Sequence, residues 1–298
     1  MRITQLDGLR GLFSVLIIFL HYPKEYLPSY IYENFIIRNS FIFVDFFFVI
    51  SGFVISYNYS KTNLDLKLFL KKRIISLYPL LFYTSFIFIF FEITGSIFFK
   101  ELLNSPETLK ILFQRAINTL LMINSMPIFN NGWINEPSWS ISAEIISYLF
   151  FGLVIRYFFN KKDVISIIII LISLITLYNI GDFFIFGGLS FLRALVGFFI
   201  GYFVFVCHKF YIIKLPYNFD SFLCIALLGV LYTLNTLNGK QLLLFSVIII
   251  PLFSGLFILT ITHDNGKFTR LMKTNTFQFL GKISYSVYLN HFIIILII

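Results

Sequence analysis

Ten long apolar segments dominate the sequence, and each is close to the length that crosses a lipid bilayer. They cover residues 8–22, 41–59, 74–99, 111–129, 138–159, 164–180, 189–207, 221–237, 241–262 and 279–298. A transmembrane helix needs about 20 mostly apolar residues, because the hydrocarbon core of a bilayer is about 30 Å thick. The segments therefore predict an all-α, polytopic integral membrane protein with about ten transmembrane or re-entrant helices.

The composition supports this class and argues against a soluble domain. Hydrophobic residues make up 58% of the chain and charged residues only 12%, about half the charged share of a soluble domain. The connections between the apolar segments are short. We therefore expect residues 1–298 to form a single transmembrane domain. The chain ends seven residues after His291, so we expect a short last helix.

Basic residues gather in the connections. The net charge is +9, and in a membrane protein such an excess reflects loops that remain on the cytoplasmic side. Nucleic acid is therefore not an expected partner. The basic groups are Lys61, Lys67, Lys71, Lys72 and Arg73; Arg156, Lys161 and Lys162; Lys209 and Lys214; and Lys267, Arg270 and Lys273. They predict a multi-pass membrane protein with a cytoplasmic N-terminus.

One pair of basic groups conflicts with ten crossings. Three apolar segments separate the group at 61–73 from the group at 156–162, so ten crossings would place them on opposite sides. Either segment 111–129 is re-entrant, or the charge rule is overridden. The sequence leaves both possibilities open.

The first apolar segment carries polar residues on one face. On a helix, Arg10, Ser14 and His21 share a stripe, with Arg10 and His21 about 16 Å apart along the axis. Charged and titratable groups in an apolar setting indicate a functional site. Asp45 in the second segment is such a group too. Gly52, on the same face as Asp45, allows a neighbouring helix to approach closely.

Two other polar stripes have both a functional and a structural interpretation. Ser140, Glu144 and Ser147 share one side of a predicted helix. Glu144 is either a proton acceptor, a group that orients a histidine, or part of a polar seam between helices. Tyr285, Tyr288 and His291 form a stripe that is either functional or an interfacial aromatic belt.

The remaining polar groups are weaker candidates. Lys72 and Arg73 either anchor a helix at the cytoplasmic surface or hold phosphates. His208 and His263 lie beside Lys209 and Asp264 in predicted loops, where we expect solvated side chains without a functional role.

Four motifs together resemble the membrane-bound acyltransferase-3 family. They are Arg10-Gly11 with His21; Asp45 to Phe53, which includes Ser51 and Gly52; Trp139-Ser140-Ile141-Ser142-x-Glu144; and Ser284-Tyr285-Ser286-Val287-Tyr288-Leu289-x-His291. They occur in the family's order across nearly the whole chain. Lys72 and Arg73 match a basic pair of the family, but Ser76 stands where the family has a further arginine.

The resemblance implies an O-acetyltransferase-like enzyme of the bacterial cytoplasmic membrane. Such an enzyme moves an acyl group, usually acetyl, from cytoplasmic acyl-CoA to a hydroxyl of a cell-envelope polysaccharide or glycolipid. The acyl-CoA is a co-substrate, and neither a bound cofactor nor a metal site is expected. His21 would be the base or acyl-relay group, assisted by Glu144 or Asp45. Arg10, Lys72 and Arg73 would engage coenzyme A phosphates or polarise the thioester.

Two other classes of function compete with acyl transfer. A secondary transporter or flippase-like carrier would also place ionisable residues in the membrane, but such carriers usually show inverted repeats or broken helices, and no repeat is visible in this sequence. A non-catalytic scaffold would not need both His21 and Glu144. The sequence does not indicate the oligomeric state.

Overall fold

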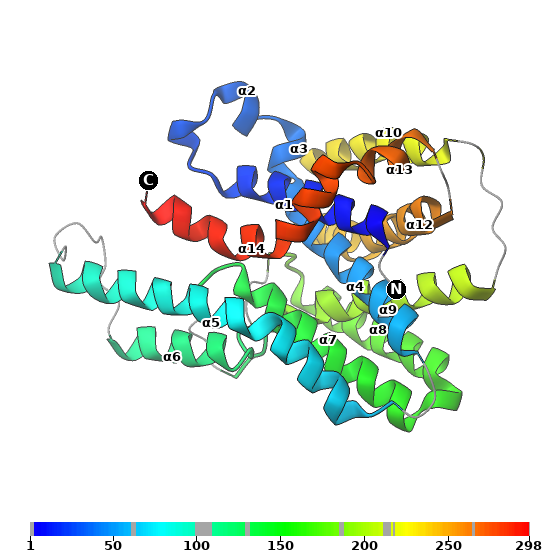
Figure 1. Cartoon of the computed structure of the whole chain (residues 1–298), viewed down its shortest axis with the longest axis horizontal. Coiled ribbons are helices and arrows are strands. Elements are labelled where there is room, and N and C mark those ends of the chain that lie inside the picture. Colours follow the sequence, from blue (N-terminus) through cyan, green and yellow to red (C-terminus); the bar gives the residue numbers. More distant parts are fainter. Residues whose placement is uncertain are drawn as a thin grey trace. The chain divides into compact units, whose positions relative to one another are not determined.

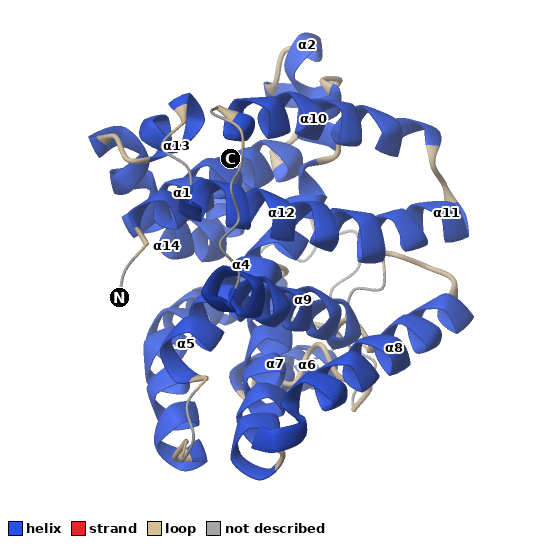
Figure 2. Ribbon diagram, turned by 90° about the vertical axis from the view of Figure 1, so that its right-hand side faces the viewer, coloured by secondary structure: helices blue, strands red, loops and turns tan. Residues whose placement is uncertain are grey.

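A computed structural model describes residues 3–60, 64–98, 109–128, 132–184, 188–210, 216, 218–263 and 266–297. The described residues form helices and loops, without strands (Figure 2). The chain divides into two compact units. Unit 1 comprises Met1–Lys61, Asn160–Phe183 and Leu195–Tyr288, and unit 2 comprises Thr62–Phe159, Phe184–Ala194 and Leu289–Ile298. The prediction of an all-α protein is confirmed.

The α-helices are labelled in chain order in Figure 1. They are α1 (Thr4–His21), α2 (Ser29–Tyr32), α3 (Phe35–Arg38), α4 (Phe43–Tyr59), α5 (Leu66–Phe98), α6 (Leu109–Leu120), α7 (Ser138–Tyr157), α8 (Lys162–Ile180), α9 (Phe191–Phe210), α10 (Phe219–Thr233), α11 (Gly239–Leu244), α12 (Ile250–His263), α13 (Lys267–Met272) and α14 (Asn275–Ile297).

Among the described residues, seven helical segments are long and apolar enough to cross a membrane. They are Ser40–Tyr59, Leu66–Gly95, Ser138–Tyr157, Phe159–Ile180, Phe191–Phe210, Phe219–Thr236 and Gly239–His263. The protein is therefore polytopic as predicted, although the count of ten is not reproduced. Helices α1 and α14 cover the first and last predicted segments without joining this set.

Predicted boundaries are wrong in two places. Helix α6 has 12 residues, a length of about 18 Å that cannot cross the hydrocarbon core. The predicted helix 111–129 stops at Leu120 because turns follow it. Helix α5 begins at Leu66, so the basic residues from Lys67 to Arg73 lie on a helix and not in a loop. Lys61 and Lys214 lie outside the described residues.

Helices α4 and α9 of unit 1 pack backbone against backbone. A Cβ at Gly52 would lie 1.9 Å from the carbonyl oxygen of Phe198, and one at Gly201 would lie 2.1 Å from that of Val49. Gly197 and Gly201 form the small-xxx-small pattern that lets membrane helices approach closely. The prediction that Gly52 permits close helix packing is confirmed.

Glycines also allow α1 to pack closely against α13 and α14. A Cβ at Gly8 would lie 2.2 Å from the Met272 carbonyl oxygen, and one at Gly281 would lie 2.3 Å from that of Asp7. Gln278 ties these helices together, since its Nε2 donates to Thr4 O at 2.7 Å and to Met272 O at 2.8 Å. Figure 1 shows α1 beside α13.

The helix ends of unit 1 gather in two groups. At one end, Gln5 at the start of α1 donates to Ile261 O near the end of α12, at 3.1 Å. The ends of α4 and α9 lie there too, because the His208 ring contacts those of Tyr57 on α4 and His263 at the end of α12. We call this the basic end, since it carries the exposed residues Lys209, Lys267, Arg270 and Lys273. At the opposite end, Asn39 donates to Leu231 O at 3.0 Å.

Unit 2 is built on the antiparallel pair α5 and α7, with α6 beside them (Figure 1). The Phe69 ring lies 6.2 Å from that of Tyr148 and 6.1 Å from that of Phe151. Fifteen residues further along α5, Thr84 accepts a hydrogen bond from Asn135, which precedes α7, at 3.4 Å. These contacts set the register of the two helices.

Polar side chains hold the α6–α7 connection. Asn124 Nδ2 donates to Ser138 Oγ at 2.8 Å, and Ser142 Oγ donates to Met122 O at 2.7 Å. Non-helical backbone persists within a membrane protein only where it is buried in protein or lines a polar cavity. The buried serines at the start of α7 supply this protection.

Candidate functional site

Three helices of unit 1 carry motif residues and pack on one another. The rings of Phe13 on α1 and Phe43 on α4 stack with centroids 4.1 Å apart. The Phe47 ring of α4 lies 6.1 Å from the Tyr288 ring of α14. A Cβ at Gly11 would lie 2.6 Å from the backbone of α14 at Leu280. The structure therefore brings α1, α4 and α14 together.

His21 is the last residue of α1 and is partly buried. Its Nδ1 lies 3.0 Å from the carbonyl oxygen of Ile17. A carbonyl oxygen only accepts, so Nδ1 carries the hydrogen and the lone pair of the neutral ring is on Nε2. That atom is suited to take a proton. On the same stripe, Ser14 is buried, and its Oγ donates to Gly11 O at 2.8 Å.

Asp45 lies nearer the level of Arg10 than that of His21. Ser40 Oγ donates to Leu16 O at 3.1 Å, and Phe43 stacks on Phe13, so α1 and α4 run antiparallel. Continuing that register places the buried Asp45 level with the residue after Arg10, about 15 Å of helix rise from His21. Of the two carboxylates considered as partners of His21, Asp45 therefore lies at the wrong level for a direct hydrogen bond.

Unit 2 brings the basic pair and the other carboxylate to one level. The register of α5 and α7 places Glu144 opposite Ile75, within one helical turn of Arg73 and Ser76. Lys72 is exposed on α5, whereas Arg73 and Glu144 are partly buried. Glu144 accepts a hydrogen bond from the Tyr148 hydroxyl.

The other residues of the α7 motif organise the start of that helix. Trp139 is buried, and the guanidinium carbon of Arg193 lies 5.3 Å from its ring centroid, a cation–π distance. Ser140 Oγ donates to Pro137 O at 2.8 Å, and Ser142 holds the α6–α7 connection. These contacts give the motif serines a structural role.

His291 belongs to unit 2 and is buried, with 2% of its surface exposed. Two residues before it, Leu289 O accepts a hydrogen bond from Asn135 at 3.0 Å. The last motif is therefore tied to the α6–α7 connection. Tyr285 and Tyr288, on the preceding turns of α14, belong to unit 1, and so does Ser51, which is buried on α4.

The motif residues span almost the whole chain, and a family comparison covers the same range. A family model described as an acyltransferase domain matches residues 3–298. The chain belongs to the acyltransferase-3 family. It is therefore a membrane protein with an acyltransferase domain, as the motifs predicted. Searches of curated proteins and of solved structures found no match.

The geometry of this acyltransferase assigns several motif glycines to packing. Gly8 and Gly11 precede and follow Arg10 and bring α1 against α13 and α14, while Gly52 brings α4 against α9. The family motifs thus combine polar residues with the small residues that position their helices.

Sequence reasoning missed the role of Asp220. Its carboxylate is fully buried and accepts hydrogen bonds from Ser221 N at 2.6 Å and Thr269 N at 2.7 Å. It therefore holds α13, on which Gly8 of α1 packs, against the start of α10. The available signal was a carboxylate at the beginning of an apolar segment.

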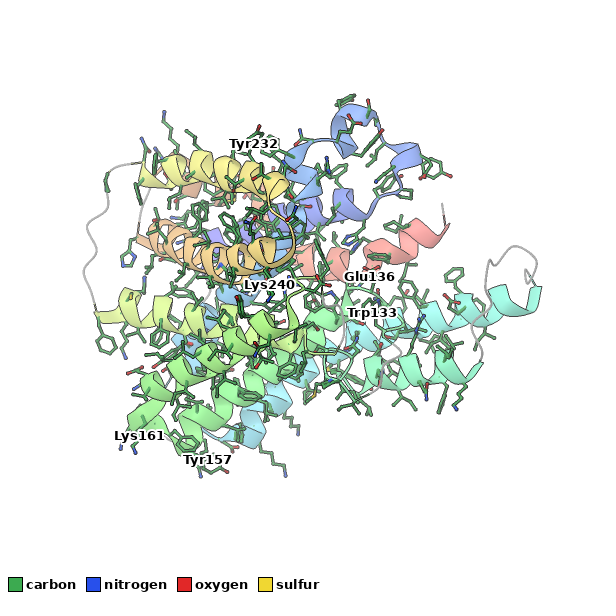
Figure 3. The ribbon with its side chains drawn as sticks, turned by 180° about the vertical axis from the view of Figure 1, so that it is seen from behind. Trp133, Glu136, Tyr157, Lys161, Tyr232 and Lys240 are labelled. Atoms are coloured by element: carbon green, nitrogen blue, oxygen red, sulfur yellow. The ribbon has the colours of Figure 1, made fainter. Side chains whose placement is uncertain are left out.

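Sequence reasoning also missed Glu136, which lies in the connection that leads to α7 (Figure 3). Burial raises the pKa of its carboxyl above the ordinary value. Its neighbour Asn135 makes the contacts to α5 and α14, so Glu136 titrates beside a structural junction of unit 2.

The prediction that His208 and His263 lie in loops is wrong, although His263 is exposed as expected. Both lie in the last turns of helices, α9 and α12. Their ring centroids are 4.3 Å apart. A signal was available in the sequence. Both residues directly follow a predicted apolar segment, and the basic groups beside them were both assigned to the cytoplasmic side.

Proposed function

We propose that this acyltransferase moves an acyl group, with acetyl as the expected group, from cytoplasmic acyl-CoA to a hydroxyl of a cell-envelope polysaccharide or glycolipid. The observation that carries the proposal is the family match over residues 3–298, because it includes the helix that presents His21.

His21 acts as the base for the acceptor hydroxyl. Its Nε2 takes the hydroxyl proton while the hydroxyl oxygen attacks the thioester carbonyl carbon. The C–S bond then breaks, and the ester forms. The departing thiolate receives a proton from the imidazolium, which restores neutral His21. A positioned base of this kind contributes about 10²- to 10⁴-fold to the rate.

The donor is held from the basic side of the membrane. Lys72 and Arg73 suit phosphate oxygens, Lys as a point charge and Arg as a bidentate donor. Glu144 lies at the same level as Lys72 and Arg73, and its carboxylate offsets part of their positive charge. Arg10, about 16 Å along α1 from His21 and toward the basic end, adds a further bidentate donor for these phosphates. Ser76 leaves the donor surface with one arginine fewer than the family motif has.

The distribution of basic residues supports a single orientation. We assign nine crossings to α1, α4, α5, α7, α8, α9, α10, the α11–α12 segment and α14, with α6 re-entrant. This places all four basic groups on one side, as the positive-inside rule requires. The basic end of unit 1, with the start of α1, then faces the cytoplasm, and His21 lies toward the outer face.

The proposal is tested in cells that express the protein. Envelope polysaccharide and glycolipid from wild-type and His21→Ala strains are analysed for ester-linked acetyl groups, with Lys240→Ala, an exposed substitution, as control. Acetylation is expected in wild type and control and is expected to be lost with His21→Ala at equal protein level. Unchanged acetylation in the His21→Ala strain would exclude the base role. Movement of a glycolipid without consumption of acetyl-CoA would favour a carrier instead.

A reporter inserted within residues 131–136 tests the topology. The nine-crossing arrangement predicts an external signal, because a re-entrant α6 returns to the side from which it enters. A cytoplasmic signal would show that α6 completes a crossing.

A further inference from the structure

His208 and His263 form a contact that acyl transfer does not use. The two rings, from the last turns of α9 and α12, have centroids 4.3 Å apart and planes tilted by 58°. His263 is exposed and His208 partly exposed, so the pair is open to ions in solution. Within the described part of the chain, no three His, Cys, Asp or Glu side chains form a metal-binding group.

Hydrogen bonds select the same tautomer in both rings. His263 Nδ1 lies 3.0 Å from Leu259 O, a carbonyl that only accepts. His208 Nδ1 lies 3.4 Å from Thr262 Oγ1, and that hydroxyl lies 2.9 Å from each of two carbonyl oxygens. The single hydroxyl hydrogen goes to a carbonyl, so His208 Nδ1 must donate. Each neutral ring therefore carries its lone pair on Nε2.

This pattern is the one that metal-binding histidines show. A ligating imidazole usually donates its second N–H to a carbonyl, carboxylate or water, which orients the ring for the ion. With metal–nitrogen distances of about 2.0–2.1 Å, two ring centres lie about 4.5 Å apart at a right angle around one ion and about 5.2 Å apart at the tetrahedral angle of Zn²⁺. The observed 4.3 Å fits the right angle of a tetragonal Cu²⁺ site, and the exposed His263 ring would move by about 1 Å to hold tetrahedral Zn²⁺.

The helix ends around the pair also favour a cation. Helices α9 and α12 end at the pair, and α4 ends beside it, since the His208 ring contacts those of Phe53 and Tyr57. Helix C-termini carry partial negative charge and carbonyl groups without helical partners. The neighbouring Lys209 opposes a cation, but its ammonium lies over the Phe210 ring, 5.1 Å from the centroid.

We propose that His208 and His263 bind one transition-metal ion through their Nε2 atoms. Zn²⁺ and Cu²⁺ are the ions of choice, because imidazole suits both, and water completes the coordination. The bound ion would link the ends of α9 and α12. This proposal is independent of the acyl-transfer reaction and of His21.

The test uses the full chain, purified without a histidine tag. Equilibrium dialysis against Zn²⁺ alone, followed by elemental analysis, is expected to give one ion per wild-type chain. His263→Ala changes an exposed side chain and should lose that stoichiometric binding. His21→Ala is the matched histidine control and should retain it. No bound zinc in wild type, or equal binding by His263→Ala, would overturn the proposal.

Two measurements keep the test informative if a histidine variant folds poorly. Electron paramagnetic resonance of wild type with one equivalent of Cu²⁺ should show coupling to two imidazole nitrogens, and coupling to none or to one would overturn the site. Thr262→Val keeps both ligands but removes the hydroxyl that orients His208. It should weaken Zn²⁺ binding by about tenfold, and unchanged affinity would contradict the orienting hydrogen bond.

Discussion

The two units are stabilised in different ways. In unit 1, glycines bring α4 against α9, and α1 against α13 and α14, so that carbonyl oxygens lie where a side chain would otherwise be. In unit 2, Asn124, Asn135 and Ser142 use their side chains to hold a non-helical connection between α6 and α7. Helix packing in unit 1 therefore requires glycines, which lack a side chain, whereas the α6–α7 connection of unit 2 requires hydrogen bonds from particular polar side chains.

The difference shows how each unit can present functional residues. Close helix packing fixes the position of α1, which carries Arg10 and His21 on one stripe. A connection buried by polar contacts lets unit 2 begin α7 inside the protein, with Glu144 six residues beyond its first residue. Each of the following variants tests one side of this contrast.

The largest effect is expected from Gly52→Ala. The new Cβ would lie 1.9 Å from the Phe198 carbonyl oxygen, so α4 and α9 must separate, at a cost of about 3 kcal/mol. Thermal unfolding of purified protein measures the loss. Gly229→Ala is the control, because nothing lies within 4 Å of its new Cβ, and it should stabilise α10 by about 0.5–1 kcal/mol. Similar destabilisation by both variants would refute the packing role of Gly52.

Asp220→Ala tests the hydrogen bonds by which Asp220 joins α10 to α13 in unit 1. Loss of the carboxylate leaves the buried Thr269 N–H without its acceptor, which should cost about 2 kcal/mol. Hydrogen exchange should become faster in α13. Asp220→Asn keeps one acceptor oxygen and should show a smaller change. If exchange in α13 of the alanine variant is as slow as in wild type, the Asp220 hydrogen bonds are not needed to hold α13 in place.

Asn135→Ala tests whether the α6–α7 connection of unit 2 depends on the side-chain hydrogen bonds of Asn135. It removes hydrogen bonds to Leu289 O and Thr84 Oγ1, with an expected loss of about 1–2 kcal/mol and faster hydrogen exchange around residues 132–137. Asn238→Ala is the matched control, because Asn238 is exposed and its side chain does not cap α11. Equal exchange in both variants would contradict the role of Asn135.

The smallest effect concerns pH. Because burial raises the pKa of Glu136, the folded state favours the protonated form. The resulting stability is present below the unfolded pKa and declines as pH rises through the folded pKa. Glu136→Gln, which stays neutral, should therefore raise the melting temperature relative to wild type near pH 8 and leave it unchanged near pH 4.

Exposed Glu25→Gln controls for the change in net charge in this comparison. An equal shift for Glu136→Gln at both pH values would show that ionisation of Glu136 is not responsible.

The apolar pattern predicted unit 1 well, because spanning helices with short connections leave few alternatives. It also identified Gly52 as a position of close helix packing. It failed at 121–128, where apolar residues such as Leu121 and Met122 continue the pattern but hydrogen bonds to Ser138 and Ser142 stabilise turns. Those bonds join residues 14–20 positions apart, which hydrophobic periodicity cannot detect.

The candidate site was predicted by residue type more accurately than by position. The stripe on α1 follows directly from helix periodicity. The level of Asp45 depends on the antiparallel register of α1 and α4, and the contact of His208 with His263 depends on the packing of α9 on α12. Both arise from tertiary contacts, so the sequence could suggest the residues but not their neighbours.

The most direct test measures release of the coenzyme A thiol from acetyl-CoA by purified protein in the presence of envelope glycan. Transfer by wild-type protein should release thiol at a rate that depends on the glycan. His21→Ala should reduce that rate by about 100-fold or more, while Lys240→Ala should not change it. A His21→Ala protein that is folded and transfers acetyl at the wild-type rate would contradict the central role assigned to His21.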